Sequence, residues 1–515
     1  MRNYSDNKKR ELLISALEKY LPETLTDGEI NFDTLRETLG MSEYYEFTWA
    51  GKQSVRREAD APVTHRELKY IPEKSFNPDN TENIYIEGDN LDALKLLRSD
   101  YGGKVKVIYI DPPYNTGNKL VYNDDFSLTN RELAEMSGRR VKGPRFREDL
   151  KKGSLIHTNW LNMIYPRLKV SRELLADNGI IFISIGEREI HNLRQICDEI
   201  FGAENYLNQL IWVSNITGRQ ISGHGAAKTY EYILVYAKDI RCACSFSVDI
   251  FFARNKMPDA YKGFKKDIRE DERGKFAVGD TLYNHNRKFN EETRPNLVFS
   301  IFYNPLTGEI RTGEVNDEIE GFIKLPPHPN GDGIHKYHAW RWSKEKIARE
   351  SYNLIVLPVK KGYEIYTRVR NFNKTLLKDL ITNISNGDKE LQKLFGDKKY
   401  FDYPKSVDLI KLLIGSVKEN DIVLDFFSGS STTAHAVMEL NAEDGGKRKF
   451  ILVQLPENPV SKSGAERAGY KNICEIGEER IRRAVEKIRK DNPNAVFDDG
   501  FKVFEVADKN AGGNI

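Results

Sequence analysis

The sequence predicts an α/β fold built on a mainly parallel sheet, and two observations carry that prediction. The run from Val105 to Ile110 is apolar and rich in β-branched residues, as expected of a strand buried on both faces. A similar short run, Asn83 to Glu87, precedes it, and an amphipathic helical pattern from Leu91 lies between them. This spacing matches a right-handed βαβ unit, in which the two strands are parallel.

Length and composition indicate a multidomain protein of ordinary soluble character. At 515 residues the chain is too long for one core, so two or three domains are expected. No apolar run reaches about 18 residues, and the N-terminus lacks the apolar centre of a secretory signal. Neither a disulfide framework nor a zinc pattern is formed by the four cysteines, Cys197, Cys242, Cys244 and Cys474. We therefore expect a reduced, cytoplasmic protein without a structural metal.

Changes in pattern along the chain suggest four regions. Residues 1–65 should form a helical and extended arm, and residues 66–240 carry alternating strands and helices. Residues 241–400 lose this rhythm, mix aromatic with basic side chains, and contain 29 Lys and Arg against 22 Asp and Glu. The alternation returns in residues 401–515. The basic, irregular region of α+β character hints at a polyanionic partner.

The strand predicted at 105–110 ends at an unusual turn, which consists of Asp111, Pro112, Pro113 and Tyr114. Prolines cannot donate to a strand ladder, so the strand must end there. Ligands of open α/β sheets bind just beyond the carboxyl ends of the strands. The turn therefore places a carboxylate and an aromatic face where such a fold carries its chemistry. Asp89 follows the strand predicted at 83–87 and should face the same edge of the sheet as Asp111.

A second strand-to-turn element lies some 300 residues later in the chain. The strand 421–427 contains Asp425 and leads into the small residues 428–433 and then an Ala-rich helix. Small residues between a strand and a helix let the backbone approach a nucleotide-like ligand closely. The strand 449–454 follows. If the two turns act together, their strands must be neighbours in one sheet, with residues 241–400 projecting beyond it.

Together, the runs 111–114 and 425–430 resemble the paired motifs of the amino-directed DNA methyltransferases. The first is similar to that family's catalytic DPPY, and the second to its FxGxG loop for S-adenosylmethionine. The catalytic motif comes first here, which is the order of the β class. Segments 88–91, 111–117 and 403–405 resemble more narrowly the modification (Mod) subunits of type III restriction systems. The resemblance covers most of 45–240 and 400–505.

This resemblance implies a Rossmann-like, S-adenosylmethionine-dependent methyltransferase fold with circularly permuted motif order and an inserted target-recognition domain at 241–400. It also implies which residues bind the cofactor: Asp89, Lys405, Asp425, Phe427, Gly429, Ser430 and one of Gln454 and Glu457. Lys405 would meet the cofactor's methionine carboxylate. Two positions depart from the family pattern, because Ser431 replaces the second glycine of the loop and Gln454 replaces a ribose-binding acid.

The residue types suit methylation of an exocyclic amine. The lone pair of adenine N6 is delocalised into the ring, so the amine attacks a methyl sulfonium poorly. Asp111 and the Pro112 carbonyl, by accepting its two N–H groups, would make the nitrogen more nucleophilic. Tyr114 offers a face on which a flipped base can stack. None of the cysteines follows a proline, so the Pro-Cys nucleophile of cytosine-C5 enzymes is missing.

The expected function is site-specific adenine-N6 methylation of double-stranded DNA within a restriction-modification system. Alternatives are N4-cytosine methylation, methylation of RNA or of protein glutamine, and a non-catalytic DNA-recognition subunit of the same fold. Asp111 favours adenine, because Ser more often stands there in N4-cytosine enzymes and Asn in glutamine enzymes. The type III resemblance further implies a homodimer and a separate restriction (nuclease-helicase) subunit, since the chain has no P-loop.

Overall fold

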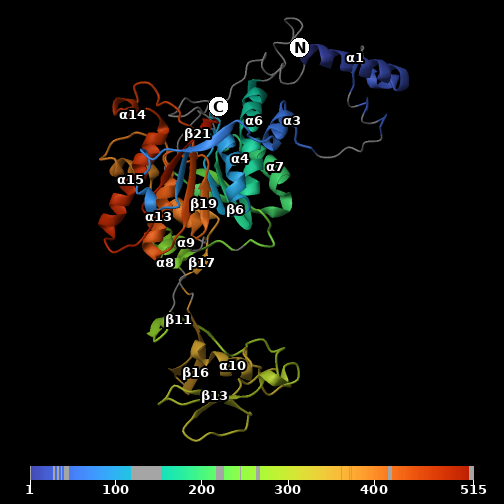
Figure 1. Ribbon diagram of the computed structural model, residues 1–515. Helices are drawn as coiled ribbons and strands as arrows, with labels where there is room; N and C mark the ends of the chain where they lie inside the picture. The colour runs from blue at the N-terminus through green and yellow to red at the C-terminus, as the bar shows by residue number, and fades with distance from the viewer. Residues whose placement is uncertain are drawn as a thin grey trace, which may run out of the picture.

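A ten-stranded sheet with helices on both faces forms the main body of the protein (Figure 1). The computed structural model describes residues 2–26, 29–31, 34–35, 38–39, 46–116, 152–215, 226–243, 245–262, 267–360, 362–370, 372, 374–415 and 420–509. Gly117, which ends one of the predicted motifs, and Cys244 lie outside these residues.

The sheet is mainly parallel, which confirms the predicted α/β class. Its strands, in spatial order, are β18 (Leu380–Ile381), β7 (Tyr206–Val213), β8 (Tyr230–Ala237), β6 (Leu175–Ile185), β5 (Val105–Ile110), β19 (Ile422–Asp425), β20 (Lys449–Gln454), β4 (Ile84–Glu87), β21 (Lys502–Asp508) and β3 (Arg66–Tyr70). Among the described strands of this sheet, β8 and β3 run opposite to the other eight.

β5 and β19 are adjacent and parallel, as the two strand-to-turn elements required. Val107 pairs with Val423, and Ile108 with Leu424. All six residues of β5 are buried. Because both strands run in the same direction, the turns that follow them lie at the same edge of the sheet.

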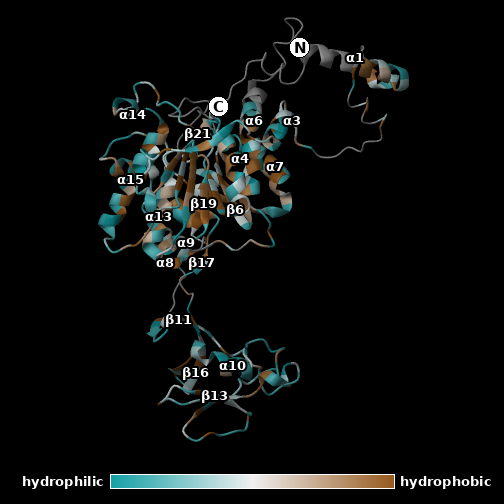
Figure 2. Ribbon diagram, in the orientation of Figure 1, coloured by the Kyte–Doolittle hydropathy of each residue, from teal (hydrophilic) through white to brown (hydrophobic). Residues whose placement is uncertain are grey.

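Two layers of helices bury the sheet, and alternate residues of β5 point into each. Val107 and Tyr109 belong to one core, and Ile108 and Ile110 to the other. Hydrophobic residues accordingly gather along the central strands (Figure 2). The first core is covered by α8 (Ile250–Lys256), α9 (Pro258–Tyr261), α12 (Val407–Ile414), α13 (Thr432–Asp444) and α15 (Ile473–Asp491), and the second by α3 (Lys52–Asp60), α4 (Asn90–Tyr101), α6 (Lys152–Leu174) and α7 (Ile190–Phe201).

The N-terminal region has two parts, one distant from the main body and one packed against it. The helix α1 (Arg2–Tyr20) lies away from the main body, and the short strands β1 (Leu25–Thr26) and β2 (Glu29–Ile30) follow it (Figure 1). Trp49, by contrast, is fixed to α6, because its indole Nε1 donates to Asn162 Oδ1 at 2.7 Å. Among the described helices, none combines the length and the apolar character needed to cross a bilayer.

A second, smaller body projects from the main one (Figure 1). Its own core contains Phe299, Trp340 and Ile365. It consists of the sheet β10 (Ile268–Asp271), β11 (Gly274–Thr281), β16 (Gly362–Val369) and β15 (Leu354–Val359), the sheet β13 (Ile310–Gly313), β12 (Ser300–Tyr303) and β14 (Ile323–Leu325), and the helix α10 (Lys344–Glu350).

The chain leaves and rejoins the main body at one place. β9 (Ser247–Asp249) pairs with β17 (Lys374–Leu376), with Asp249 opposite Lys374. Segments on the main-body side of this pair, including α8, α9 and β18, pack on or join the large sheet. The helices α11 (Gly387–Leu394) and α14 (Gly464–Arg467) share a small core with the start of α15. The smaller body thus spans about residues 267–370, inside the predicted 241–400.

Candidate active site

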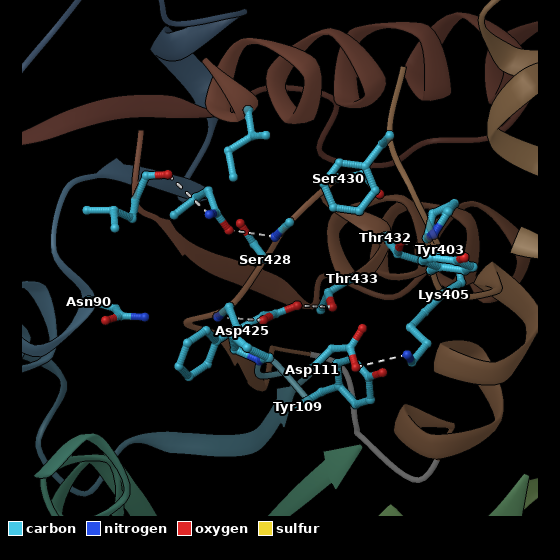
Figure 3. A pocket seen from close by; sticks show the side chains of 18 of the residues that line it. Asn90, Tyr109, Asp111, Tyr403, Lys405, Asp425, Ser428, Ser430, Thr432 and Thr433 are labelled. Atoms are coloured by element: carbon cyan, nitrogen blue, oxygen red, sulfur yellow. Dashed lines mark hydrogen bonds and ion pairs between the residues drawn. The ribbon is translucent and has the colours of Figure 1, made fainter. Parts of the chain in front are cut away.

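A cavity of about 220 Å³ opens at the carboxyl ends of β5 and β19 (Figure 3). Nine of the twelve predicted site residues line it: Asp111, Pro113, Lys405, Asp425, Phe427, Gly429, Ser430, Gln454 and Glu457. Asp89, Pro112 and Tyr114 are not among the lining residues. The two motifs, far apart in sequence, therefore meet around one space.

The turn after β5 is held by the helix beneath it. Trp160, fully buried on α6, donates its indole N–H to the Pro113 carbonyl at 2.7 Å. Asn115 adopts a left-handed conformation, with φ of 57°, and its amide donates to the buried carboxylate of Glu189 at 2.5 Å. These contacts fix the peptides on either side of Tyr114.

The Lys405 ammonium lies beside Asp111, where the resemblance had implied a cofactor carboxylate. Its Nζ is 2.9 Å from Asp111 Oδ1 and 3.3 Å from Glu231 Oε2, and Figure 3 shows the first of these contacts. Burial raises the pKa of Asp111 above its ordinary value, and Lys405 partly opposes that rise. Burial lowers the pKa of Lys405, but the two carboxylates outweigh it, so that pKa is raised. Lys405 is therefore a buried cation.

The turn after β19 is organised by Asp425 and Gln454. Asp425 accepts from the Thr433 hydroxyl at 2.6 Å and from the backbone N–H of Phe427 at 3.1 Å. Burial nevertheless raises the pKa of Asp425 to about 7. Gln454 Oε1 accepts from the Gly429 N–H at 2.7 Å, and its Nε2 donates to the Leu455 carbonyl at 3.2 Å. Both ends of the Gln454 amide are thus engaged with the protein.

Ser431, which departs from the family pattern, carries backbone strain. It has φ of 62° and ψ of 37°, a left-handed conformation that costs a non-glycine residue about 1 kcal/mol. Its hydroxyl is buried and has no hydrogen-bond partner in the described part of the chain. The fully buried Arg480 stabilises this turn by donating to the hydroxyls of Ser430 at 2.8 Å and Thr432 at 2.6 Å.

At the other wall, Asp89 acts as a helix cap. It accepts from the N–H groups of Leu91 and Asp92 at the start of α4, and Arg167 Nη2 lies 2.8 Å from its second oxygen. Arg167 and Asn90 line the cavity instead of Asp89. Asp89 therefore positions the cavity-lining Arg167 and the start of α4.

The cavity suits a ligand such as S-adenosylmethionine, which has an aromatic ring, hydroxyls and both charges. Phe427 and Phe401 supply apolar faces, and Glu457 and Arg167 supply charges of either sign. The buried Ser428 hydroxyl lines the cavity, and the described residues leave it without a hydrogen-bond partner. A buried polar group of this kind calls for a ligand or water to satisfy it.

The fold and this site define an amino-directed DNA methyltransferase, and comparison with known proteins agrees. Residues 105–486 match the family of DNA methylases that act on N6 and N4 amines, so the chain belongs to that family, whose methyl donor is S-adenosylmethionine. The predicted resemblance to type III Mod subunits is also confirmed. The Mod subunit of the type III enzyme EcoPI, from Escherichia phage P1, is 36% identical over 90% of this chain and 72% of its own length.

Two further proteins are similar to this chain. The type II methyltransferase M.KpnI from Klebsiella pneumoniae is 30% identical over 81% of this chain and 93% of its own length. Among solved structures, the complex of M1.HpyAVI with S-adenosylmethionine is 14% identical, with a TM-score of 0.30, over 77% of this chain and 98% of that one.

Several residues of the site were not predicted from the sequence. Glu231, Trp160, Arg167 and Arg480 all hold a predicted residue in place. Glu231 left a signal, because it is the one acid in the otherwise apolar and aromatic run Tyr230–Ala237. The others lie on amphipathic helices, where a charged or aromatic residue is unremarkable.

Replacing Ser431 with glycine should stabilise the protein. The change relieves the left-handed strain and removes a buried hydroxyl without a partner, so we expect the free energy of unfolding to rise by about 1 kcal/mol. Urea denaturation measures the difference. Ser431→Ala is the control, because it removes the hydroxyl but keeps the strain. An equal or larger gain for alanine would contradict the strain argument.

The raised pKa of Asp425 predicts a pH dependence of stability. The folded carboxyl, with a pKa of about 7 against an ordinary 3.8, holds its proton more tightly than the unfolded one. Stability contributed by the protonated form is therefore lost as pH rises through that window. As pH rises from 3.8 to about 7, the free energy of unfolding of Asp425→Asn should therefore increase relative to that of the wild type, by about 4 kcal/mol at most. Urea denaturation at a series of pH values measures this difference. A constant difference in unfolding free energy between the two proteins across the window would contradict the raised pKa of Asp425.

Proposed function

We propose that this protein methylates the N6 amine of adenine in duplex DNA at a specific sequence, by direct attack after the base has been flipped out. The observation that carries the proposal is the meeting of Asp111 and the 425–431 turn around one cavity. Asp111 supports adenine rather than N4-cytosine, in line with the family pattern of the first motif residue.

In the proposed mechanism Asp111 and the Pro112 carbonyl accept the two N–H groups of the target amine. Trp160 donates to the carbonyl of the next residue, Pro113, which fixes the peptide that joins Pro113 to Tyr114. Tyr114 is fixed through its hydroxyl, which donates to Glu231 at 2.9 Å, and its ring is the stacking surface for the base. When bound, S-adenosylmethionine would supply the methyl group from its sulfonium. Asp111, which accepts one N–H of the amine, is placed to take the proton that the methylated nitrogen releases.

The cofactor is held, in this proposal, by the cavity residues Phe427, Gly429, Ser430 and Asp425. Both candidates for the ribose line the cavity, and Gln454 also fixes Gly429 through its amide oxygen. A Cβ at Gly429 would lie 3.1 Å from the ring of Phe401, so the backbone there packs closely against that ring. Lys405 is assigned to Asp111 rather than to the cofactor's carboxylate.

Target recognition is assigned to the smaller body, residues 267–370. The smaller body contains 17 Lys and Arg against 16 Asp and Glu, and its basic side chains are interleaved with aromatic ones. That mixture suits contacts to phosphates combined with base readout in a groove. Its separate core supports an independent unit, and the paired strands β9 and β17 lie at its junction with the main body. Residues outside it, including α8, α9 and β18, are assigned to the methyltransferase domain.

Partners and location follow from the relatives rather than from the fold. We propose a cytoplasmic homodimer that works with a separate restriction subunit, as the type III similarity suggests. The match to a type II methyltransferase supports a second possibility, in which the chain modifies DNA without such a partner. Light scattering of the purified chain, and co-purification with a nuclease-helicase from the source cell, distinguish these assemblies.

Replacing Asp111 with asparagine should reduce methyl transfer from labelled cofactor to duplex DNA by about 100-fold or more, because the amide cannot accept as strongly or carry the charge. Asp239→Asn, in an exposed ion pair with Arg241, is the matched control and should keep wild-type activity. Mass spectrometry of the digested product should show N6-methyladenine. N4-methylcytosine, or full activity of the Asp111 variant, would overturn the proposal.

Exchanging residues 267–370 for those of a relative with a different target should change the methylated sequence. The cut points lie beyond the β9–β17 pair, so the main sheet is untouched. Sequencing of modified bases reads the new target, and calorimetry should find the affinity for S-adenosylmethionine unchanged within about threefold. A chimera that still methylates the original sequence would show that recognition resides elsewhere.

A further inference from the structure

Glu231 is a second carboxylate at the proposed amine site, supplied by the antiparallel strand β8. It pairs across the sheet with Trp212 of β7. Its Oε2 accepts from the Tyr114 hydroxyl at 2.9 Å and lies 3.3 Å from Lys405 Nζ. The side chain is 22% exposed, so it is mostly shielded from water. One carboxylate thus contacts both the stacking tyrosine and the buried lysine.

The Lys405 ammonium is enclosed by two acids and two aromatic rings. Asp111 and Glu231 lie on it at 2.9 Å and 3.3 Å, and the rings of Tyr114 and Trp212 are centred at 4.9 Å and 5.7 Å. Its side chain is only 9% exposed. Attraction between these charges is strong because little water screens them. The ammonium is therefore shared between the two carboxylates rather than dedicated to Asp111.

Sharing matters because Asp111 must keep an acceptor available for the target amine. Without Glu231, the whole attraction of Lys405 would fall on Asp111, which would then accept less strongly from the incoming N–H. Glu231 also fixes the Tyr114 ring through its hydroxyl. Loss of its charge would disturb the two walls of the amine site together.

We propose that Glu231 is a positioning residue for methyl transfer, which draws Lys405 away from Asp111 and fixes the ring of Tyr114. The proposal rests on the proposed function, because it takes Asp111 as the acceptor of the target amine. It separates the role of Lys405 from cofactor binding and assigns it to tuning the catalytic carboxylate.

Opposite effects on Asp111 are expected from its two charged neighbours. The negative Glu231 disfavours ionisation of Asp111, and the positive Lys405 favours it. The ionisable groups that face Asp111 are Lys405, Glu231, Tyr114, Tyr109 and Asp425, and Glu231 also faces Lys228. Of these groups, Glu231 and Lys405 are the two that carry opposite charges beside Asp111 at neutral pH.

The test measures single-turnover methylation of duplex DNA against pH for Glu231→Gln, Lys405→Met and the double variant. Glu231→Gln should lower the plateau rate about tenfold. It should also move the acid limb, the low-pH side of the curve of rate against pH on which Asp111 ionises, to lower pH. Lys405→Met should move that limb to higher pH, and the double variant should lie between. Affinity of Glu231→Gln for S-adenosylmethionine should stay within about threefold of wild type.

Two further variants keep the test decisive. Glu231→Asp retains the charge, so its acid limb should match wild type even if its rate falls. Asp239→Asn, which removes an acid paired with Arg241 away from the site, should change neither rate nor limb. If the wild type is active but the acid limb of Glu231→Gln stays in place, or moves in the same direction as that of Lys405→Met, the role of Glu231 is refuted and the proposed function stands. A wild type inactive on every duplex would refute the proposed function and this inference together.

Discussion

The parallel pairing of β5 with β19 is the constraint on which the site depends. Neither turn could form the cavity alone, since one carries Asp111 and the other the loop that begins at Asp425. Burial of β5 on both faces fixes its register, because a shift by one residue would exchange the side chains of the two cores. Packing of α6 and α13 against this pair then fixes the turns through Trp160 and Thr433.

In the proposed reaction, the charges in the cavity match the direction in which charge moves during methyl transfer. Positive charge leaves the sulfonium and arrives on the attacked nitrogen, so an anion near that nitrogen stabilises the transition state more than the ground state. Asp111 stands at the nitrogen side in our proposal. Lys405 and Glu231 set the strength of that anion, while burial raises the pKa of Asp425, on the cofactor side, to about 7. Neighbours therefore matter as much as the motif itself.

What the sequence predicted well was local: the buried runs of β4, β5 and β19 and the turns that follow them, because apolar periodicity and proline act within a few residues. The adjacency of β5 and β19 followed from requiring the two turns to cooperate. The contact of Lys405 with Asp111 could not be predicted, because it joins segments nearly 300 residues apart and depends on side-chain length. Asp89 shows the same limit, since a helix cap and a ligand contact require the same residue type at the same place.

The paired strands β9 and β17 also bear on how such a chain folds. β5 and β19 are separated by more than 300 residues, and contacts of such long range slow folding because the loop must close first. If the smaller body collapses on its own core, β9 and β17 bring residues 249 and 374 together and shorten the effective loop. An insertion of over a hundred residues then behaves kinetically like a short turn, and its length can drift without delaying assembly of the catalytic sheet.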